Sequence, residues 1–545
     1  MKKALLISVA GIIAVSFFLS LTIWAGNPAA DLQSAIQKSD RELIKKAVDQ
    51  LVLQNDTKAC DALINSANSA PDSGTYWILL EGLSRFTNTE VISKMTSYIV
   101  SNKAKEIGRD LLGAMKNNRS SSILPLLKEV IEKGTYEMKI ECIHQLSAIT
   151  IKESLDVLFG FLKPLDEKND KELVKETIGA LKRVTGVDKG NYPASWLAWW
   201  EENKNKQISD IIKPKTADGG SIDNVSQYRD MTGLEDLTKD KVIVVRNDLC
   251  DEKAKTGGFD GNYDHIQDIL TRLGIEHKVV GKSELEKDSF DWDNIWVLIF
   301  NCTMYKEHCC NPKHKAGTTK TSERLVNCVG EGPHQNHKPE VSDKTIKKIT
   351  KFVETGGYLF TEDMNINEII VKAFKGIIAS TKFLPAKDVP ILPAPGAALH
   401  PYLKYVFEAA PSSSSNAPDT SEADKSGETK SVKPGEFRID TEWKIDEDSP
   451  DIKVLKKDVT VLIMSPKLVT KSNTDGAVAV TFGVSGSNIV TTGNEKGPSY
   501  KGGGRVLHVM SHFGHQKSKV DEFALQNLIL NFIMELNQRR PRAKK

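Results

Sequence analysis

The sequence predicts two structural parts in one chain: a helical repeat domain, followed by a doubly wound, mainly parallel α/β domain. Up to residue 205, apolar residues recur every three or four positions, which is typical of amphipathic helices. From residue 241 onward, short apolar runs alternate with amphipathic segments, which is typical of strands joined by helical crossovers. The length of 545 residues also favours more than one domain.

The composition is that of a globular protein, with 39% hydrophobic and 27% charged residues. The net charge is only +2, and acidic and basic residues are interspersed. Proteins that bind nucleic acids usually carry a strongly basic face, so this charge balance argues against a nucleic-acid partner.

The first 30 residues predict export from the cytoplasm. Lys2 and Lys3 precede an uncharged, mostly apolar run over residues 4–25, as in a signal peptide. The run is long enough to span a bilayer, and no A-x-A cleavage site follows it, so an uncleaved membrane anchor is favoured over a cleaved signal. We therefore expect the remaining chain to be periplasmic or held at the outer face of the cytoplasmic membrane.

Residues 31–205 are expected to form the helical domain. Similar amphipathic segments return at 107–115, 139–149 and 174–184, a period of roughly 30–35 residues that is typical of two-helix solenoid units. One helix pair cannot bury its own apolar stripe, so stacking of pairs is expected. This pattern resembles a HEAT-like repeat array. A Trp-rich helix near its end, with Trp196, Trp199 and Trp200 on one face, is expected to cap the array.

A polar segment, residues 206–240, is expected to link this array to an α/β domain over residues 241–540. Strands are expected at 241–248, 275–280, 294–301, 358–363, 459–465, 477–482 and 505–511, and helices at 264–274, 342–357, 366–374 and 522–536. Two insertions interrupt the pattern. Residues 302–341 are rich in Cys and His, and residues 411–434 have the composition of a disordered loop.

Two stretches carry a resemblance to a known superfamily. They are KFVETGGYLFTEDMNINEIIVKAFKG (351–376) and GGRVLHVMSHFGHQKSKVDEFALQNLILNFIMEL (503–536). They resemble the class I glutamine amidotransferase-like superfamily, which has a flavodoxin-like fold. In active members, the turn after the first of these strands holds a nucleophilic cysteine, and the second stretch supplies the catalytic histidine, here near His512 or His515.

The turn after the first strand departs from the active members of the superfamily. Residues 361–365 contain neither cysteine nor serine, and no glycine that would ease a strained turn. A thiolate nucleophile requires the sulfur atom and an exposed, strained position. The resemblance is therefore to non-catalytic, ThuA-like members, which occur in exported bacterial proteins beside helical repeats. It implies architecture more than activity.

Three ionisable residues are candidates for a site at the sheet edge. Glu362 and Asp363 end one expected strand and His512 follows another, and ligands of open α/β sheets bind beside the carboxyl ends of the strands. Such a pair of carboxylates with a histidine could bind a ligand or perform acid–base chemistry. The alternative is that the carboxylates only cap helices, where negative charge is favoured.

A second candidate site lies in the insertion at 302–341, where thiols and imidazoles could ligate Zn²⁺. The candidate ligands are Cys302, Cys309, Cys310, Cys328, His308 and His314. Their spacing matches no standard zinc motif, and in an exported protein disulfides among these cysteines are at least as well supported. The sequence leaves both open, and it contains no motif for another cofactor.

Because the nucleophile is missing, we expect an exported, non-catalytic interaction or scaffold protein. Its partner would be a protein or a glycan, bound through the repeat array and the degenerate amidotransferase-like domain. The alternative is a periplasmic hydrolase of carbohydrate or amide bonds that uses Glu362, Asp363 and His512. A metal-handling or redox role for the Cys/His-rich insertion is a third possibility.

Overall fold

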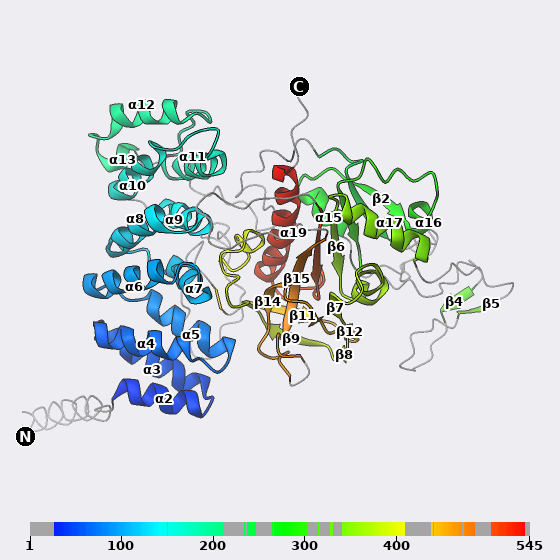
Figure 1. The fold of residues 1–545 in the computed structure, drawn as a ribbon, viewed down its shortest axis with the longest axis horizontal. Helices are drawn as coiled ribbons and strands as arrows, with labels where there is room; N and C mark the ends of the chain where they lie inside the picture. Colours follow the sequence, from blue (N-terminus) through cyan, green and yellow to red (C-terminus); the bar gives the residue numbers. More distant parts are fainter. Residues whose placement is uncertain are drawn as a thin grey trace, which may run out of the picture. The chain divides into compact units, whose positions relative to one another are not determined.

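The computed structural model describes residues 27–149, 151–211, 234, 237–246, 264, 266–302, 314–316, 328–330, 341–408, 438–439, 441–470, 473–484 and 503–539 (Figure 1). The expected export segment lies outside these ranges. Within them, no helix combines the length and the apolar character needed to cross a membrane. The chain divides into two compact units, Met1–Lys94 and Met95–Lys545. The domain boundaries expected from the sequence stay predictions.

The first unit is a run of short helices, three of which are capped by aspartates. Its helices are α2 (Pro28–Gln37), α3 (Arg41–Gln54), α4 (Thr57–Asn68), α5 (Ser73–Ser84) and the start of α6 (Thr89–Ser101). Asp40, Asp56 and Asp72 each precede a helix and accept hydrogen bonds from its first backbone N–H groups. Leu32, Ile44, Leu63 and Trp77 are fully buried between the helices, as the apolar periodicity predicts.

The second unit begins with further helices and confirms a helical region before the sheet. They are α7 (Glu106–Ala114), the 3-10 turns Met115–Asn117 and Ser121–Ile123, α8 (Leu124–Lys133), α9 (Tyr136–Ala148), α10 (Lys152–Leu162), α11 (Lys171–Thr185), α12 (Pro193–Asn203) and α13 (Ile208–Ile211). In the Trp-rich helix α12, Trp196 and Trp200 are buried, and Trp200 stacks on Phe159 of α10 at 4.6 Å between ring centroids. These indoles therefore pack internally.

An eight-stranded, mainly parallel sheet follows, in the order β10-β14-β15-β16-β6-β3-β1-β2. Its strands are β1 (Val242–Arg246), β2 (Lys278–Gly281), β3 (Val297–Phe300), β6 (Tyr358–Glu362), β10 (Leu392–Pro393), β14 (Thr460–Met464), β15 (Ala477–Gly483) and β16 (Arg505–Val509). Strands β2, β1, β3, β6 and β16 run parallel, and β15, β14 and β10 extend the sheet antiparallel beyond β16. Numbered by their order along the chain, the five parallel strands β1, β2, β3, β6 and β16 follow one another across the sheet as second, first, third, fourth and fifth.

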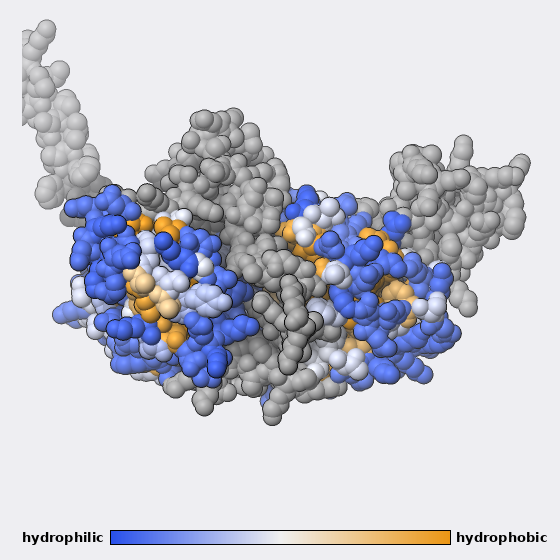
Figure 2. All heavy atoms as spheres, turned by 90° about the horizontal axis from the view of Figure 1, so that it is seen from above, coloured by the Kyte–Doolittle hydropathy of each residue, from blue (hydrophilic) through white to orange (hydrophobic). Residues whose placement is uncertain are grey.

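The central strands are buried on both faces, as their continuous apolar runs predict. Tyr358 and Phe360 of β6 pack on Phe532 of α19 (Lys519–Arg539), with centroid distances of 4.9 and 6.4 Å. The other helices of this part are α15 (Ile266–Arg272), α16 (Lys282–Leu285) and α17 (Asp343–Glu354), whose cap is Ser342 as expected. Figure 2 shows that the visible described surface is mostly hydrophilic, with hydrophobic residues in limited areas.

Two features of this part differ from the expectation. The helix predicted at 366–374 is a widened π-helical turn, Ile366–Ile370, followed by the short α18, Val371–Ala373. The region between α18 and β14 also contains paired strands that the sequence did not predict. They are β7 (Ile378–Ala379) with β13 (Lys453–Val454), β8 (Phe383–Leu384) with β12 (Ser449–Pro450), and β9 (Lys387–Pro390) with β11 (Glu442–Ile445). The ribbon β4 (His314–Ala316) with β5 (Cys328–Gly330) lies in the Cys/His-rich insertion.

Buried polar contacts join the second unit's helices to residues 394–408 of its α/β part. Asp110 of α7 accepts hydrogen bonds from the backbone N–H groups of Gly396 (2.8 Å) and Ala398 (3.3 Å). Glu176 of α11 pairs with Lys404 at 3.0 Å and with His144 of α9 at 2.9 Å. Burial opposes ionisation of Glu176, yet the charge of Lys404 and the hydrogen bond with His144 hold its pKa well below the ordinary value.

We expect Glu176→Gln to lower the free energy of unfolding by about 1–3 kcal/mol at pH 7. A carboxylate whose folded pKa is depressed stabilises the fold above its unfolded pKa of about 4.3, and this contribution is lost as the pH falls through the folded pKa. Denaturant unfolding of the variant should therefore show a weaker loss of stability below about pH 4.3 than the wild type. The exposed Glu167→Gln is the control, and an unchanged pH slope in Glu176→Gln would contradict the assignment.

One glycine is required where β16 enters the sheet. A Cβ on Gly504 would lie 1.9 Å from the carbonyl oxygen of Gly357 and 2.4 Å from that of Val353. We therefore expect Gly504→Ala to destabilise the protein by about 1–3 kcal/mol, measured by denaturant unfolding. Gly160→Ala on α10 has open space around the new methyl group and should be neutral or slightly stabilising. Equal stability of the two variants would exclude this close approach as a constraint.

Candidate functional site

The carboxyl ends of three parallel strands bring a set of ionisable side chains together. Glu362 ends β6 and Asp363 follows it, Cys302 lies two residues beyond β3, and His512 lies three residues beyond β16. Asp264 precedes α15, two residues before its first helical residue. All five residues are buried. We refer to Asp264, Cys302, Glu362, Asp363 and His512 as the central cluster.

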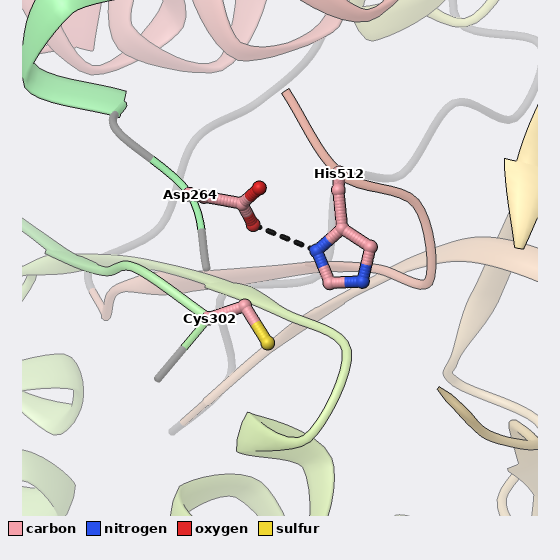
Figure 3. Close-up of side chains that lie close together, drawn as sticks. All are labelled: Asp264, Cys302 and His512. Atoms are coloured by element: carbon pink, nitrogen blue, oxygen red, sulfur yellow. Dashed lines mark hydrogen bonds and ion pairs between the residues drawn. The ribbon is translucent and has the colours of Figure 1, made fainter. Parts of the chain in front are cut away.

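His512 lies between two carboxylates. Its Nδ1 atom is 2.7 Å from Asp264 Oδ2 (Figure 3), and its Nε2 atom is 3.3 Å from Asp363 Oδ2. The thiol of Cys302 donates to the same Asp363 oxygen, with Sγ 3.6 Å away. Asp446 Oδ2 is 3.8 Å from His512 Nε2, and His515 Nε2 is 3.7 Å from Asp264 Oδ1. The side chains of Asp446 and His515 are 15% and 31% exposed, so they form the solvent side of the cluster.

Asp363 occupies a left-handed backbone conformation, with φ at 40°. The sequence contains no glycine that would ease a strained turn here, and in the structure an aspartate occupies the left-handed position. Its N–H donates to Val509 O at 2.9 Å, and its carbonyl accepts from Ile366 N at 3.0 Å. Such a conformation costs about 1–3 kcal/mol and persists only where surrounding contacts enforce it.

Two asparagines tie the strand ends together. Asn365 Nδ2 donates to the carbonyl of Asn301 at 3.0 Å, which holds the turn after β6 against the end of β3. Asn301 Oδ1 accepts from Ile266 N at 3.2 Å and its Nδ2 donates to Gln267 Oε1 at 2.9 Å. These bonds fix the start of α15, and with it Asp264, beside Cys302.

A third amide fixes the loop that carries His512. Gln516 Nε2 donates to the His512 carbonyl at 2.6 Å, and its Oε1 accepts from Lys444 N at 3.0 Å. Ser511 Oγ donates to the Lys444 carbonyl at 2.9 Å. The β11 segment that leads to Asp446 is thereby held against the histidine loop.

Burial and the neighbouring charges shift the pKa values of the central cluster. Burial, reinforced by the negative charge of Asp264, raises the pKa of Glu362 well above its ordinary value. Burial opposes protonation of His512, yet Asp264 and Asp363 raise its pKa well above the ordinary value. Burial and Asp363 raise the pKa of the Cys302 thiol to about 12. Burial therefore favours the neutral forms of Glu362 and of the Cys302 thiol, and the acidic neighbours of His512 favour its protonated form.

The structure brings together all three residues predicted for the sheet-edge site. Glu362, Asp363 and His512 converge, whereas the alternative of helix capping is not observed, because Asn365 precedes the π-turn and neither carboxylate makes a cap hydrogen bond there. Sequence reasoning missed Asp264 and Asp446. It also assigned Cys302 to the insertion, although this residue follows a buried strand and the same strand-end argument applies to it.

The other predicted metal ligands are not tested by the structure. Cys309, Cys310 and His308 lie outside the described residues. His314 and Cys328 lie on the ribbon β4 and β5, where only the backbone is described. Cys302 carries a free thiol, as do Cys60 and Cys142, so Cys302 forms no disulfide.

Comparisons with known proteins add little to this picture. No protein-family model matches the chain, and no curated protein matches it. One solved structure that aligns with it is that of Gan42B, a GH42 beta-galactosidase, at 10% sequence identity and a TM-score of 0.23. The alignment covers 66% of this chain and only 36% of the beta-galactosidase chain.

Because Cys302 is buried and its pKa is raised, we expect its thiol to resist alkylation in the folded protein. Iodoacetamide at pH 8, followed by peptide mass spectrometry, should leave Cys302 unmodified until denaturant is added, as for the equally buried Cys60 and Cys142. Rapid labelling of Cys302 alone under native conditions would contradict the buried, protonated state.

Proposed function

We propose that the α/β part of this chain is a hydrolase and that the central cluster is its active centre. The observation that carries the proposal is the position of His512, with Nδ1 2.7 Å from Asp264 and Nε2 3.3 Å from Asp363. In hydrolytic triads, a buried carboxylate orients the histidine through one ring nitrogen. The other ring nitrogen then lies beside a second reactive group and transfers protons. Carbohydrate and amide bonds are the proposed substrate classes.

Each residue has a distinct role in this proposal. Asp264 fixes the orientation of the imidazole, and His512, in the protonated form that its neighbours favour, gives a proton to the leaving group and then takes one from the attacking water. Asp363 provides the carboxylate that faces the substrate, from the strained position at φ 40°. Glu362 is the neutral acid beside Asp264 that limits the negative charge in the buried site.

The fold supports the resemblance on which part of this proposal rests. The chain order of the parallel strands, second, first, third, fourth and fifth, is that of flavodoxin-like folds, whose ligands bind at the carboxyl ends of the strands. In the glutamine amidotransferase-like superfamily, the turn after the fourth of these strands carries the nucleophile. We infer that Asp363 takes that place here, so that a carboxylate replaces the thiolate.

A HEAT-like solenoid that binds a protein or glycan partner is a second proposal, and fewer observations favour it. Asp110 of α7 and Glu176 of α11 contact residues 394–408 of the same chain directly. His144 of α9 contributes indirectly, through its hydrogen bond with Glu176. This face of the helices is thus occupied internally. We infer that the helices of the second unit support the α/β part. Export, with or without a retained anchor at residues 1–30, stays a proposal.

A substrate screen with a matched pair of variants tests the hydrolase proposal. The full chain is incubated with chromogenic glycosides and with peptide and aryl amides. We expect turnover of one class, which Asp363→Asn should lower by about 100-fold or more, because the loss of a positioned acid–base group typically costs 10²–10⁴-fold. Asp448→Asn is the control, since Asp448 is also left-handed, with φ at 65°, but is exposed and outside the cluster. Activity that is equal in both variants would refute the role of the cluster.

A further inference from the structure

We propose that the central cluster binds one divalent transition-metal ion, best fitted by Zn²⁺, through Cys302 Sγ, a carboxylate oxygen of Asp363 and His512 Nε2. Asp264 would not ligate the ion but would orient His512 through the hydrogen bond to Nδ1. The inference uses the residues of the proposed active centre, but it does not require that any substrate be hydrolysed, since metal binding is measured on the protein alone. It differs from the zinc site expected in the insertion, with which it shares only Cys302.

Two of the three distances between the candidate ligand atoms match those of a tetrahedral zinc site. With Zn–S near 2.3 Å and Zn–N and Zn–O near 2.0–2.2 Å, tetrahedral geometry places N and O ligands about 3.4 Å apart and S and O ligands about 3.6 Å apart. The observed separations are 3.3 Å for His512 Nε2 to Asp363 Oδ2 and 3.6 Å for Cys302 Sγ to Asp363 Oδ2. One ligand atom each from Asp264, Cys302 and His512 also lies within 4.8 Å of the other two (Figure 3).

The orientation of His512 is that of a metal ligand. Histidines that bind metals generally donate their second ring N–H to a carboxylate, which fixes the tautomer and the ring plane. Asp264 Oδ2 accepts from Nδ1 at 2.7 Å, and this leaves Nε2 directed at Asp363 and near Asp446. Asp446 Oδ2, 3.8 Å from Nε2 on the solvent side, is positioned for a fourth ligand or for a bridging water.

The balance of charge also favours a bound cation. Four carboxyl groups converge here: burial favours the neutral form of Glu362, Asp446 pairs with Lys444 at 2.9 Å, and Asp264 and Asp363 share His512. Among the described residues, no lysine or arginine pairs with Asp264 or Asp363. Within the same part of the chain, Asp363 Oδ1 is buried without a hydrogen-bond partner, whereas Glu362 in its neutral form hydrogen-bonds to Asp264. Burying such groups unpaired is costly, and a dication would offset the cost.

The donor set selects the kind of metal. Mg²⁺ and Ca²⁺ prefer sites built only from oxygen atoms, whereas a thiolate, an imidazole and a carboxylate together suit Zn²⁺. On binding, the thiol of Cys302 and the protonated Nε2 of His512 both release their protons, since the thiolate and a neutral imidazole nitrogen are the ligands. An ion at this position would bind a water molecule and lower its pKa, which supplies a nucleophile for the proposed hydrolysis.

The test measures metal content and affinity in the full chain. Elemental analysis of protein saturated with Zn²⁺ and then freed of excess should give one ion per chain, and competition with a chelating dye gives the affinity. We expect Cys302→Ala and His512→Ala to weaken binding by more than about 100-fold, and Asp264→Asn by about 10–100-fold. Cys142→Ala is the matched control, since Cys142 is an equally buried thiol remote from the cluster in sequence, and it should bind as the wild type does.

Replacement of Zn²⁺ by Co²⁺ reports thiolate ligation spectroscopically in the wild type itself, whose fold no substitution has changed. The wild type should show a thiolate-to-Co²⁺ charge-transfer band in the near ultraviolet, and Cys302→Ala should lack it. No stoichiometric binding by the wild type would overturn the proposal, as would zinc retained in Cys302→Ala and His512→Ala but lost from a Cys309→Ala/Cys310→Ala variant. Zinc binding without hydrolysis of any substrate refutes only the proposed function, whereas hydrolysis by a chain that shows no stoichiometric zinc binding refutes only the metal site.

Discussion

The buried hydrogen bond between His512 Nδ1 and Asp264 Oδ2 joins two segments that are 248 residues apart in the sequence. Everything proposed for the site depends on it, because it fixes which nitrogen of His512 faces Asp363 and Cys302. The bond itself depends on the sheet, since β3, β6 and β16 end at one edge and deliver Cys302, Asp363 and His512 within a few ångströms of one another. Asn301, Asn365 and Gln516 then hold the loops that follow.

Much of the sheet could be predicted from the sequence, because strands buried on both faces read as continuous apolar runs. The segments VLIF (297–300) and YLFTE (358–362) are examples, and both occupy the sheet centre. The short ribbons between α18 and β14 could not be predicted, since strands of two to four residues carry no periodicity. The position of Asp446 beside the cluster therefore could not be predicted either, because this residue follows one such strand, β11.

Only those residues of the site that directly follow a recognisable strand could be predicted from the sequence. Glu362, Asp363 and His512 were found because they follow clear strands, whereas Asp264 precedes a helix and carries no local signal. The left-handed turn at Asp363 could not be read from residue types, because no glycine marks it. Long-range hydrogen bonds, such as that from Asn365 to Asn301, enforce this turn, and single-sequence patterns do not contain them.

We predict that the central cluster is a preformed metal-binding active centre. Anomalous diffraction at the zinc absorption edge, from crystals of the full chain grown with Zn²⁺, tests this most directly. The predicted result is one anomalous peak within bonding distance of Cys302 Sγ, Asp363 and His512 Nε2, with Asp264 hydrogen-bonded to Nδ1. Zinc found only elsewhere in the chain, with His512 turned away from Asp264 and Asp363, would contradict it.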